Sequence, residues 1–417
     1  MPNYIKNSFL YLPLKISLGF IIFSELLVFI GPIDFGIKNP ISLFIYLLIV
    51  NIAFYMGYKV GIKKYKPLYS HIGIKIIELI IVLGLILHFI KMNEMWLSHG
   101  LSFSIENLLL AIFRPADAYF SESLESSQAS SLTAFLSPIT WASIPLGIYK
   151  WKHLSRFFKS LVVLTIIIEI FSWLGIGTRK GLFDVIVIVF FIVIIQSKDY
   201  FSGRKIPRKF LFTTMFLAAF FVFYFIFSNL ARYNLGMDEM GSFNFKKDIR
   251  HLYSEYCPTW LLVSLYNIDS YLCQGYYALS IGLSIGIISP TFLGMSWFTM
   301  VIANKFGYDP MPGTYMTLLE QYGIDAKINW HTIYLWLAND FTFIGVPFVI
   351  FIIGYFFAKT WCDSIHGKND CAIPIFSLFL IMVFYFYANN QVLSFSLIAF
   401  FFWFVVYILS GRRKLKR

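Results

Sequence analysis

Charged residues are scarce in this chain: only 13% of its 417 residues are Asp, Glu, Lys or Arg, where soluble domains carry roughly one quarter. Hydrophobic residues make up 58%, and the mean hydropathy is +0.71. This composition excludes a soluble enzyme. It also excludes a membrane β-barrel, whose strands would alternate in polarity, because runs such as 185–195 are apolar on every face. The sequence therefore predicts an all-α polytopic integral membrane protein.

Metal-binding patterns are also missing. The chain has no His-Glu-x-x-His, Cys-x-x-Cys or Asp-x-Asp pattern, so we expect neither a metal ion nor another cofactor. A single loop carboxylate such as Asp34 is typical of turn chemistry. Of the four cysteines, Cys257 and Cys273 stand in a region predicted to be external, where a disulfide between them is an open alternative.

Apolar runs long enough to cross a bilayer, about 20 residues each, recur along the whole chain. The first run ends near Ile30 and no small-residue cleavage site follows it, so we expect an uncleaved span. The further predicted spans cover residues 41–60, 72–90, 132–149, 157–174, 182–195, 210–230, 341–357, 372–387 and 392–409. We therefore expect a single membrane domain, residues 1–417, of about ten transmembrane helices.

Positive charge indicates how these spans are oriented. The net charge of +12 would suggest nucleic-acid binding in a soluble domain, but here the cations cluster in every second connection, as the positive-inside rule requires. Such clusters stand at 63–66, 150–159, 198–209 and 412–417. We expect both termini in the cytoplasm and no nucleic-acid partner.

Two long connections are predicted to be external, 91–131 and 231–340, and loops of this length are usually functional. Within the second, residues 271–304 carry no charge, yet an extra crossing there would reverse the sidedness of the C-terminal cations. Glycines from Gly275 onward and Pro290 interrupt this stretch, which predicts re-entrant or interfacial helices. A two-helix hairpin is the open alternative.

Several basic side chains stand on the predicted outer side, where the charge rule disfavours them. A guanidinium there suits phosphate or diphosphate oxygens, whereas the alternative is a solvated charge paired with a nearby acid. The tight turn 175–181 joins two spans, so Arg179 must lie at the outer membrane boundary, where a snorkelling anchor is the alternative. The candidates for anion binding are Arg114, Arg179, Lys180, Arg232, Arg250 and His251.

His331 stands at the external start of the segment Thr-Ile-Tyr-Leu-Trp-Leu, which leads into a predicted span. An imidazole titrates near neutral pH, so a positioned His can remove a proton from a hydroxyl as a general base. The alternative for a lone His is a packed or hydrogen-bonded structural residue.

Three segments resemble a known superfamily. The turn Gly-Thr-Arg-Lys-Gly-Leu at 177–182 resembles the Ser/Thr-Arg-Gly-x-Leu element of O-antigen polymerases and ligases. The segment His-Thr-Ile-Tyr-Leu at 331–335, followed by Gly345, resembles their His-Asn-x-Tyr-Leu element. Gln-Gly-Tyr-Tyr at 274–277 resembles a stretch of bacterial oligosaccharide repeat-unit polymerases. Lys180 and Thr332 depart from the family pattern, which has a small residue and Asn there.

This resemblance implies a GT-C-like, metal-independent glycosyltransferase of the bacterial inner membrane, with an active site that faces the periplasm. It would polymerise oligosaccharide repeat units carried on undecaprenyl diphosphate into O-antigen or a similar surface polysaccharide. Arg179, Arg232 and Arg250 would hold the departing diphosphate, and His331 would activate the acceptor hydroxyl. Further substrate contacts are expected from Arg114, Lys180, His251, Gln274, Tyr276, Tyr277 and Tyr334.

Two alternatives stay open on the sequence. One is a ligase that transfers finished glycan to another acceptor. The other is a flippase or transporter for the lipid-linked oligosaccharide, which the intramembrane acids Glu25, Glu78 and Glu169 would suit. The chain shows no internal repeat of the kind found in transporters, which favours the enzyme. Whether a chain-length regulator is a partner, besides membrane lipid and the lipid-linked substrates, is not decided by the sequence.

Overall fold

The computed structural model describes residues 7–98, 131–197, 258–291, 297–325 and 329–411, with a few isolated positions between these ranges. Within them every named element is a helix, and an isolated bridge pairs Ser70 with Asn369. The predicted span at 210–230 and most of the predicted loop at 91–131 lie outside the described residues.

Four of the described helices are long and apolar enough to cross a membrane: α2 (Leu12–Ile30), α3 (Pro40–Lys63), α9 (Arg156–Leu174) and α17 (Ile333–His366). Two shorter helices, α18 (Ala372–Phe384) and α20 (Leu397–Leu409), are also apolar. The predicted helical, multi-pass membrane character is thus confirmed. The other helices are α1 (Asn7–Leu10), α4 (Ile74–Ser98), α7 (Ser131–Phe135), α8 (Ser137–Tyr149), α10 (Lys180–Gln196), α14 (Thr259–Ile285), α15 (Trp297–Lys305), α16 (Tyr315–Glu320) and α19 (Gln391–Phe395), with a 3-10 turn at Trp151–His153.

Local signals explain several helix starts. At α3, the Asn39 side chain accepts a hydrogen bond from Ser42 N (3.2 Å) and Pro40 occupies the first turn. At α17, Thr332 caps the helix by accepting from Leu335 N (3.3 Å), so the helix starts at Ile333. The helix thus begins before residue 341, where the predicted span starts. A break does follow there: Thr342 has φ 57° and ψ 167°, which divides α17 into two helical pieces.

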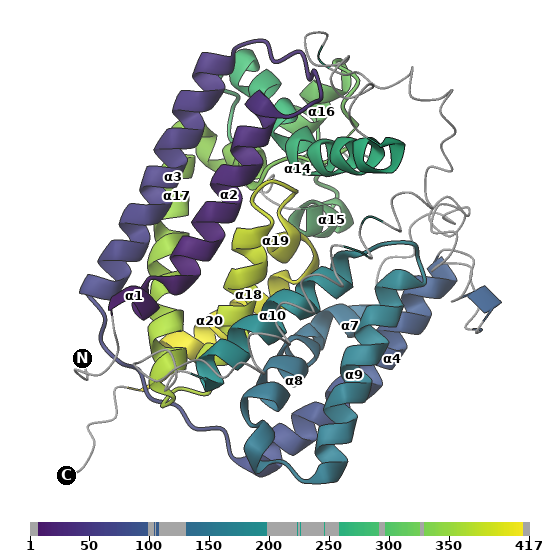
Figure 1. Cartoon of the computed structure of the whole chain (residues 1–417), viewed down its shortest axis with the longest axis vertical. Coiled ribbons are helices and arrows are strands. Elements are labelled where there is room, and N and C mark those ends of the chain that lie inside the picture. Colours follow the sequence, from purple (N-terminus) through teal and green to yellow (C-terminus); the bar gives the residue numbers. More distant parts are fainter. Residues whose placement is uncertain are drawn as a thin grey trace.

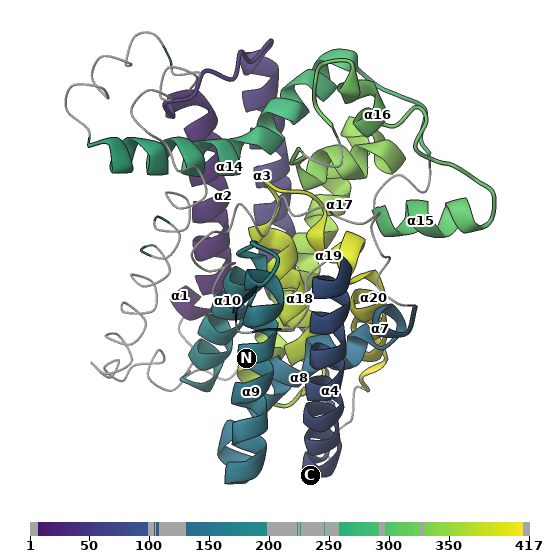
Figure 2. The ribbon, with the colours of Figure 1, turned by 90° about the vertical axis from the view of Figure 1, so that its right-hand side faces the viewer.

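The helix α14 differs from its prediction. It runs without interruption through Gly275 and Gly282 and ends at Gly286, whose φ is +87°. The expectation that these two glycines break the segment was therefore wrong: they allow close approach instead, because a β-carbon on Gly282 would collide with Leu335. Figure 2 shows α14 lying across α2 and α3 rather than along them, with α15 running in a similar direction away from these two helices.

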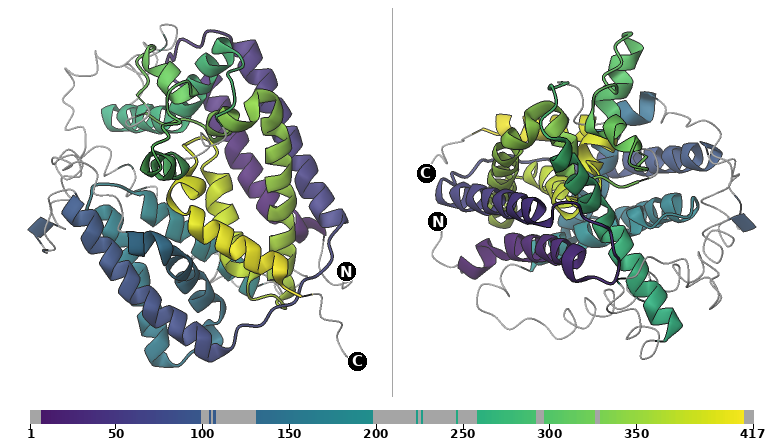
Figure 3. Two further views of the ribbon diagram at one scale, coloured as in Figure 1. Left: turned by 180° about the vertical axis from the view of Figure 1, so that it is seen from behind. Right: turned by 90° about the horizontal axis from the view of Figure 1, so that it is seen from above.

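The remaining helices form two groups that α10, α18 and α20 join (Figures 1 and 3). In one group, α3 packs along α17 through small residues: a β-carbon on Gly57 would meet the Phe351 carbonyl, and one on Gly354 would meet the Phe54 carbonyl. Such backbone contact is the usual way that membrane helices associate. In the other group, α4 packs on α8 and α9.

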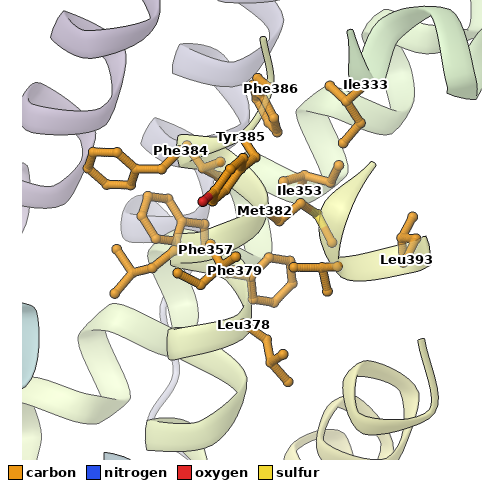
Figure 4. Packing of buried hydrophobic residues seen from close by; sticks show 14 of the residues in the cluster. Ile333, Ile353, Phe357, Leu378, Phe379, Met382, Phe384, Tyr385, Phe386 and Leu393 are labelled. Carbon is orange, nitrogen blue, oxygen red and sulfur yellow. The ribbon is translucent and has the colours of Figure 1, made fainter. Parts of the chain in front are cut away.

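Between the groups, α18 is buried along its whole length. Its aromatic rings pack on neighbouring helices (Figure 4), with Phe379 at 5.2 Å from Phe400 and Phe357 stacked on Phe376 at 5.6 Å between ring centroids. The outward faces are apolar too: exposed large hydrophobic residues on α3 include Ile41, Phe44, Ile45, Leu48, Ile49 and Ile52. Water would not solvate such a face well, whereas lipid would.

The connections between helices gather at two opposite ends of the bundle. At the first, which we call the Asp370 end, Lys150 Nζ pairs with Asp370 (2.6 Å), Ser70 N donates to Lys368 O (3.1 Å) and Tyr69 N donates to Gly411 O (3.2 Å). The charge pattern predicts all four of these connections on one side of the membrane, and their meeting agrees with that alternation. The opposite end, which carries α14, α15 and α16 (Figure 1), we call the His331 end.

Candidate functional site

His331 lies just before α17 with its side chain fully buried (0% exposed). Asn389 fixes its backbone from both sides: His331 N donates to Asn389 Oδ1 (2.9 Å), and Asn389 N donates to the His331 carbonyl. Within the described part of the chain no side chain hydrogen-bonds to the ring nitrogens of His331, while the backbone of Asn329 interacts with the ring and favours its protonated form. The imidazole is therefore held in place by its backbone and has no side-chain hydrogen-bond partner among the described residues.

Burial lowers the pKa of His331 from its ordinary value of 6.5 to about 4. The desolvation of a cation in apolar surroundings is the main cause. The ring is therefore neutral at physiological pH, the form that a general base requires.

The segment that holds His331 is the connection between α18 and α19, residues 385–390. Two further hydrogen bonds join this segment to α17. Phe386 O accepts from Ile333 N (3.0 Å), and Asn389 Oδ1 also accepts from Trp336 Nε1 (3.2 Å). Sequence reasoning missed this segment, because it treated these residues as the boundary between two spans. The signal that could have found it is Asn-Asn-Gln at 389–391, an uncharged polar run inside an otherwise apolar stretch.

The Gln-Gly-Tyr-Tyr motif of α14 packs on the same segment. Gln274 Oε1 accepts a hydrogen bond from Trp330 N (3.0 Å), next to His331. Gly275 has no room for a β-carbon, which would collide with the Tyr387 carbonyl and crowd Thr332 N. The structure thus brings the motifs at 274–277 and 331–335 into direct backbone contact.

The tyrosines expected to bind substrate divide into two kinds. Tyr276 is fully buried and its hydroxyl bonds with Ser24 Oγ (2.9 Å). Tyr334 is 1% exposed and packs on Phe386. Both side chains pack in the core of this structure, and their expected contact with substrate stays a prediction. Tyr277 alone of the three is partly exposed, against Phe35.

The third motif forms the turn between α9 and α10. Gly177 takes a positive φ of 68°, and Trp173 O accepts hydrogen bonds from Thr178 N (3.0 Å) and Thr178 Oγ1 (3.1 Å). Arg179 follows, at the N-cap position of α10. Gly181 packs against the Trp173 ring, where a β-carbon would collide, so the side chain of Trp173 lies directly on the start of α10.

Lys180 is the first residue of α10 and is already paired. Its Nζ lies 2.6 Å from Asp184 Oδ2, one helical turn later, with both side chains largely buried. The ammonium also lies 4.9 Å from the Trp173 ring centroid and 5.5 Å from that of Tyr385. The sequence analysis named Lys180 as a candidate for anion binding but did not name Asp184. The carboxylate of Asp184 neutralises the Lys180 ammonium, which weakens its attraction for an anion.

A second charged group fixes Trp173 from the other side. Glu169 accepts hydrogen bonds from Trp173 Nε1 (3.0 Å) and Lys91 Nζ (2.8 Å), and it pairs with His88 Nδ1 at 2.8 Å. We call Glu169, Lys91, His88 and Trp173 the Trp173 clamp. The sequence left open that Glu169 belongs to a proton path in a transporter. In the structure this carboxylate instead holds α4, α9 and the turn together.

Tyr385 and Tyr387 connect the clamp with His331. Tyr385 contacts Lys180, its ring stacks on that of Tyr387 at 6.1 Å, and the Tyr387 carbonyl lies against Gly275. Figure 4 shows Tyr385 and Phe386 at the end of α18. All three motifs therefore meet along residues 385–389, although they are far apart in sequence.

Other predicted residues are placed elsewhere or not at all. Arg114, Arg232, Arg250 and His251 lie outside the described residues. Asp34 makes a local turn, accepting from Gly36 N (3.0 Å), as its loop position predicts. Cys273 is a free, buried thiol, so the structure contains no disulfide at this residue. The described residues hold no group of three or more His, Cys, Asp or Glu side chains that could bind a metal ion.

A comparison of the chain with protein-family models, with curated proteins and with solved structures finds no match.

Proposed function

We propose that this chain polymerises oligosaccharide repeat units linked to undecaprenyl diphosphate, at the outer face of a bacterial inner membrane. The observation that carries the proposal is the meeting of the three motifs, 177–182, 274–277 and 331–335, along the α18–α19 connection. Segments that only happened to resemble a family would have no reason to converge on one end of the molecule.

In the proposed reaction the acceptor hydroxyl attacks the anomeric carbon of the donor sugar. A new carbon–oxygen bond forms there while the bond to the diphosphate breaks, and the hydroxyl proton passes to His331. Neutral His331 suits this role because an imidazolium could not accept a proton. The diphosphate leaves with negative charge, which the Arg179 guanidinium stabilises at the end of the Trp173 clamp.

The finer architecture is part of the same proposal. A GT-C-like enzyme of about ten spans, with both termini cytoplasmic, is supported by the four spanning helices and by the gathering of the basic connections at the Asp370 end. The His331 end then faces the periplasm. Because no nucleotide is present there, the energy for transfer comes from the sugar–diphosphate bond itself.

The decisive test uses the purified full-length protein in nanodiscs. The substrate is the lipid-linked oligosaccharide that accumulates in the source bacterium when this chain is deleted, supplied with EDTA and without nucleotide. A ladder of products on a gel supports the polymerase. The variants His331→Ala and Arg179→Ala should give no ladder, while His153→Ala and Arg156→Ala, exposed residues at the Asp370 end, should match the wild type.

The same assay separates the two rival functions. Transfer of preformed glycan to a second acceptor, with no ladder from repeat units alone, would identify a ligase. Movement of the lipid-linked oligosaccharide across liposomes without any new glycosidic bond would identify a flippase. Either result would overturn the polymerase.

A further inference from the structure

The end of α15 carries large apolar side chains that face away from the protein. Phe306, directly after the last residue of the helix, is 86% exposed, Tyr308 is 50% exposed and Ile302 is 41% exposed. We call these three residues the α15 tip. Single exposed apolar residues are common on proteins, but a group of them at a projecting end marks a surface that binds lipid or another molecule.

The turn after α15 gives the tip a defined shape. Ala303 O accepts hydrogen bonds from Phe306 N (2.9 Å) and Tyr308 N (3.1 Å). Asn304 O accepts from Gly307 N (3.0 Å), and Gly307 has a φ of +77°, the left-handed conformation that commonly ends a helix. The two aromatic side chains are therefore presented by a regular helix end and not by an irregular loop.

The side chains around α15 divide into three sides. Met300 is buried (1% exposed) and faces the bundle. Asn304 and Lys305 are exposed and polar, whereas Ile302 and Phe306 are exposed and apolar. At about 100° per residue, the two apolar residues lie on one side of the helix axis and the two polar residues on another. A helix with Lys on a polar side and Phe on an apolar side is typical of the membrane–water interface.

The level of α15 along the bundle favours lipid beside the tip. In Figure 2, α2 and α3 run nearly vertically, and α15 projects sideways from the bundle below their upper ends. The outward face of α3 is apolar from its first turn onward, beginning with Ile41 (70% exposed) and Phe44 (52% exposed). Because this face requires lipid up to the start of α3, the same layer surrounds α15 at its lower level.

A second copy of the chain is a poorer occupant of the tip. An aromatic side chain buries roughly 150–250 Å², so three partly exposed side chains offer only a few hundred Å². A stable protein–protein interface takes about 800 Å² from each partner. Lipid has no such threshold, because each apolar group gains from its own removal from water.

We propose that the α15 tip is a membrane anchor that inserts into the lipid leaflet at the His331 end. Ile302 and Phe306 then contact the lipid chains, whereas Lys305 extends to the headgroup oxygens. Because α15 contacts α19, the anchor also holds α19, which follows the α18–α19 connection, at a fixed depth. The inference goes beyond the proposed reaction and does not depend on it.

Spin labels on the full-length protein in lipid nanodiscs measure the depth of the tip. Cys273, Cys362 and Cys371 are buried, and Cys257, which lies outside the described residues, is replaced by Ser. A single nitroxide is then attached to Phe306→Cys or to Ile302→Cys. Its collisions with oxygen, which concentrates in lipid, are compared with its collisions with a nickel chelate, which stays in water. We expect both labels about 5–10 Å below the headgroup boundary, with oxygen collisions in excess.

Matched controls define the two limits and the side of the helix. Ile52→Cys, on the outward face of α3 (52% exposed), gives the value for lipid, and Gln321→Cys, an exposed position after α16, gives the value for water. A label on Asn304→Cys, on the polar side of α15, should meet more nickel chelate than the label at position 306. Phe306→Glu should release the tip and raise the nickel collisions of the label at position 302.

Two results would overturn the anchor. Collision values at position 306 equal to those at position 321 would place the tip in water. Few collisions with either reagent would mean that protein covers the tip, either a second copy or another part of this chain. A failed ladder assay would leave the label depths unchanged, so the anchor and the polymerase can fail separately.

Discussion

Gly275 of α14 and Tyr387 of the α18–α19 connection are packed backbone against backbone, with no space for a side chain between them. The contact places the crossing helix α14 directly on the segment that fixes His331. It also explains a glycine in the interior of a helix, where this residue otherwise lowers helix stability. The glycine of the Gln-Gly-Tyr-Tyr motif is thus a packing residue, which positions α14 on this segment.

Gly275→Ala should therefore disrupt this contact. Overpacking at a buried backbone contact costs about 1–3 kcal/mol, and here the neighbour is a carbonyl that cannot rotate away. We expect a lower melting temperature in detergent and reduced chain extension. The control is Gly19→Ala in α2, where a β-carbon meets nothing within 4 Å and helix propensity should make alanine neutral or stabilising. Equal melting temperatures for the two variants would refute the contact.

His331 makes stability depend on pH. In the folded protein burial lowers the pKa of His331 to about 4, whereas an exposed His in the unfolded chain titrates near 6.5. The unfolded chain therefore binds more protons between these values, and stability falls as pH drops from about 6.5 towards 4, by at most about 3.4 kcal/mol in total. The melting temperature of the wild type should decrease over this range more than that of His331→Gln. Parallel curves would show that the ring is accessible to water.

The helical, multi-pass character could be predicted from the sequence because it depends on additive properties, namely apolar length and charge. The start of α3 follows from Pro40, and the end of α9 follows from the end of an apolar run. The break at Thr342 could not be predicted, because a left-handed Thr depends on tertiary contacts and not on local preference.

The site was harder to predict for the same reason. Arg179 and His331 were found as isolated polar residues at helix ends. Asp184 could have been found too, because it stands four residues after Lys180 on the same helix. Asn389, by contrast, acquires its role only when distant parts of the chain meet, so spacing along the chain contains no signal of it. The burial of Tyr276 could not be predicted either, since an aromatic residue in a motif looks the same in the sequence whether it faces a substrate or the core.

Lys180 and Arg179 are neighbours with different expected roles. Because Asp184 neutralises Lys180, replacing the pair together by Lys180→Met and Asp184→Leu leaves no buried charge unpaired and should cost little stability. We expect this double variant to retain at least half of the polymerising activity. Arg179→Ala should lose about 100-fold or more, as when one charge-stabilising group is removed from a transition state. Equal losses would show that Lys180 also contacts the diphosphate.

The Trp173 clamp should act on Arg179 at a distance. Glu169→Gln keeps the shape of the side chain but removes the charge that Lys91 and His88 share, and we expect a loss of roughly 2 kcal/mol in stability. Activity should fall through kcat rather than through binding of the lipid-linked substrate. Trp173→Phe removes the bond to Glu169 and should shift kcat in the same direction. A change in substrate affinity alone would contradict a positioning role.

Asp370 offers a test of the opposite end of the bundle, where no catalytic role is expected. Its carboxylate pairs with Lys150 (2.6 Å), accepts from Ile72 N (3.0 Å) and lies 3.1 Å from His71 Nδ1. The side chain is only 2% exposed, and that of Lys150 only 16%, so Asp370→Asn leaves a buried cation unpaired and should cost about 3 kcal/mol. His71→Ala should change stability by no more than about 0.5 kcal/mol, because that side chain is 80% exposed.

Both variants are compared by thermal unfolding and by ladder formation below the melting temperature. Because the Asp370 end joins the two helix groups without touching the motifs, the surviving folded fraction of Asp370→Asn should extend glycan at the wild-type rate. A reduced rate per folded molecule would mean that the two ends are coupled through α17 and α18.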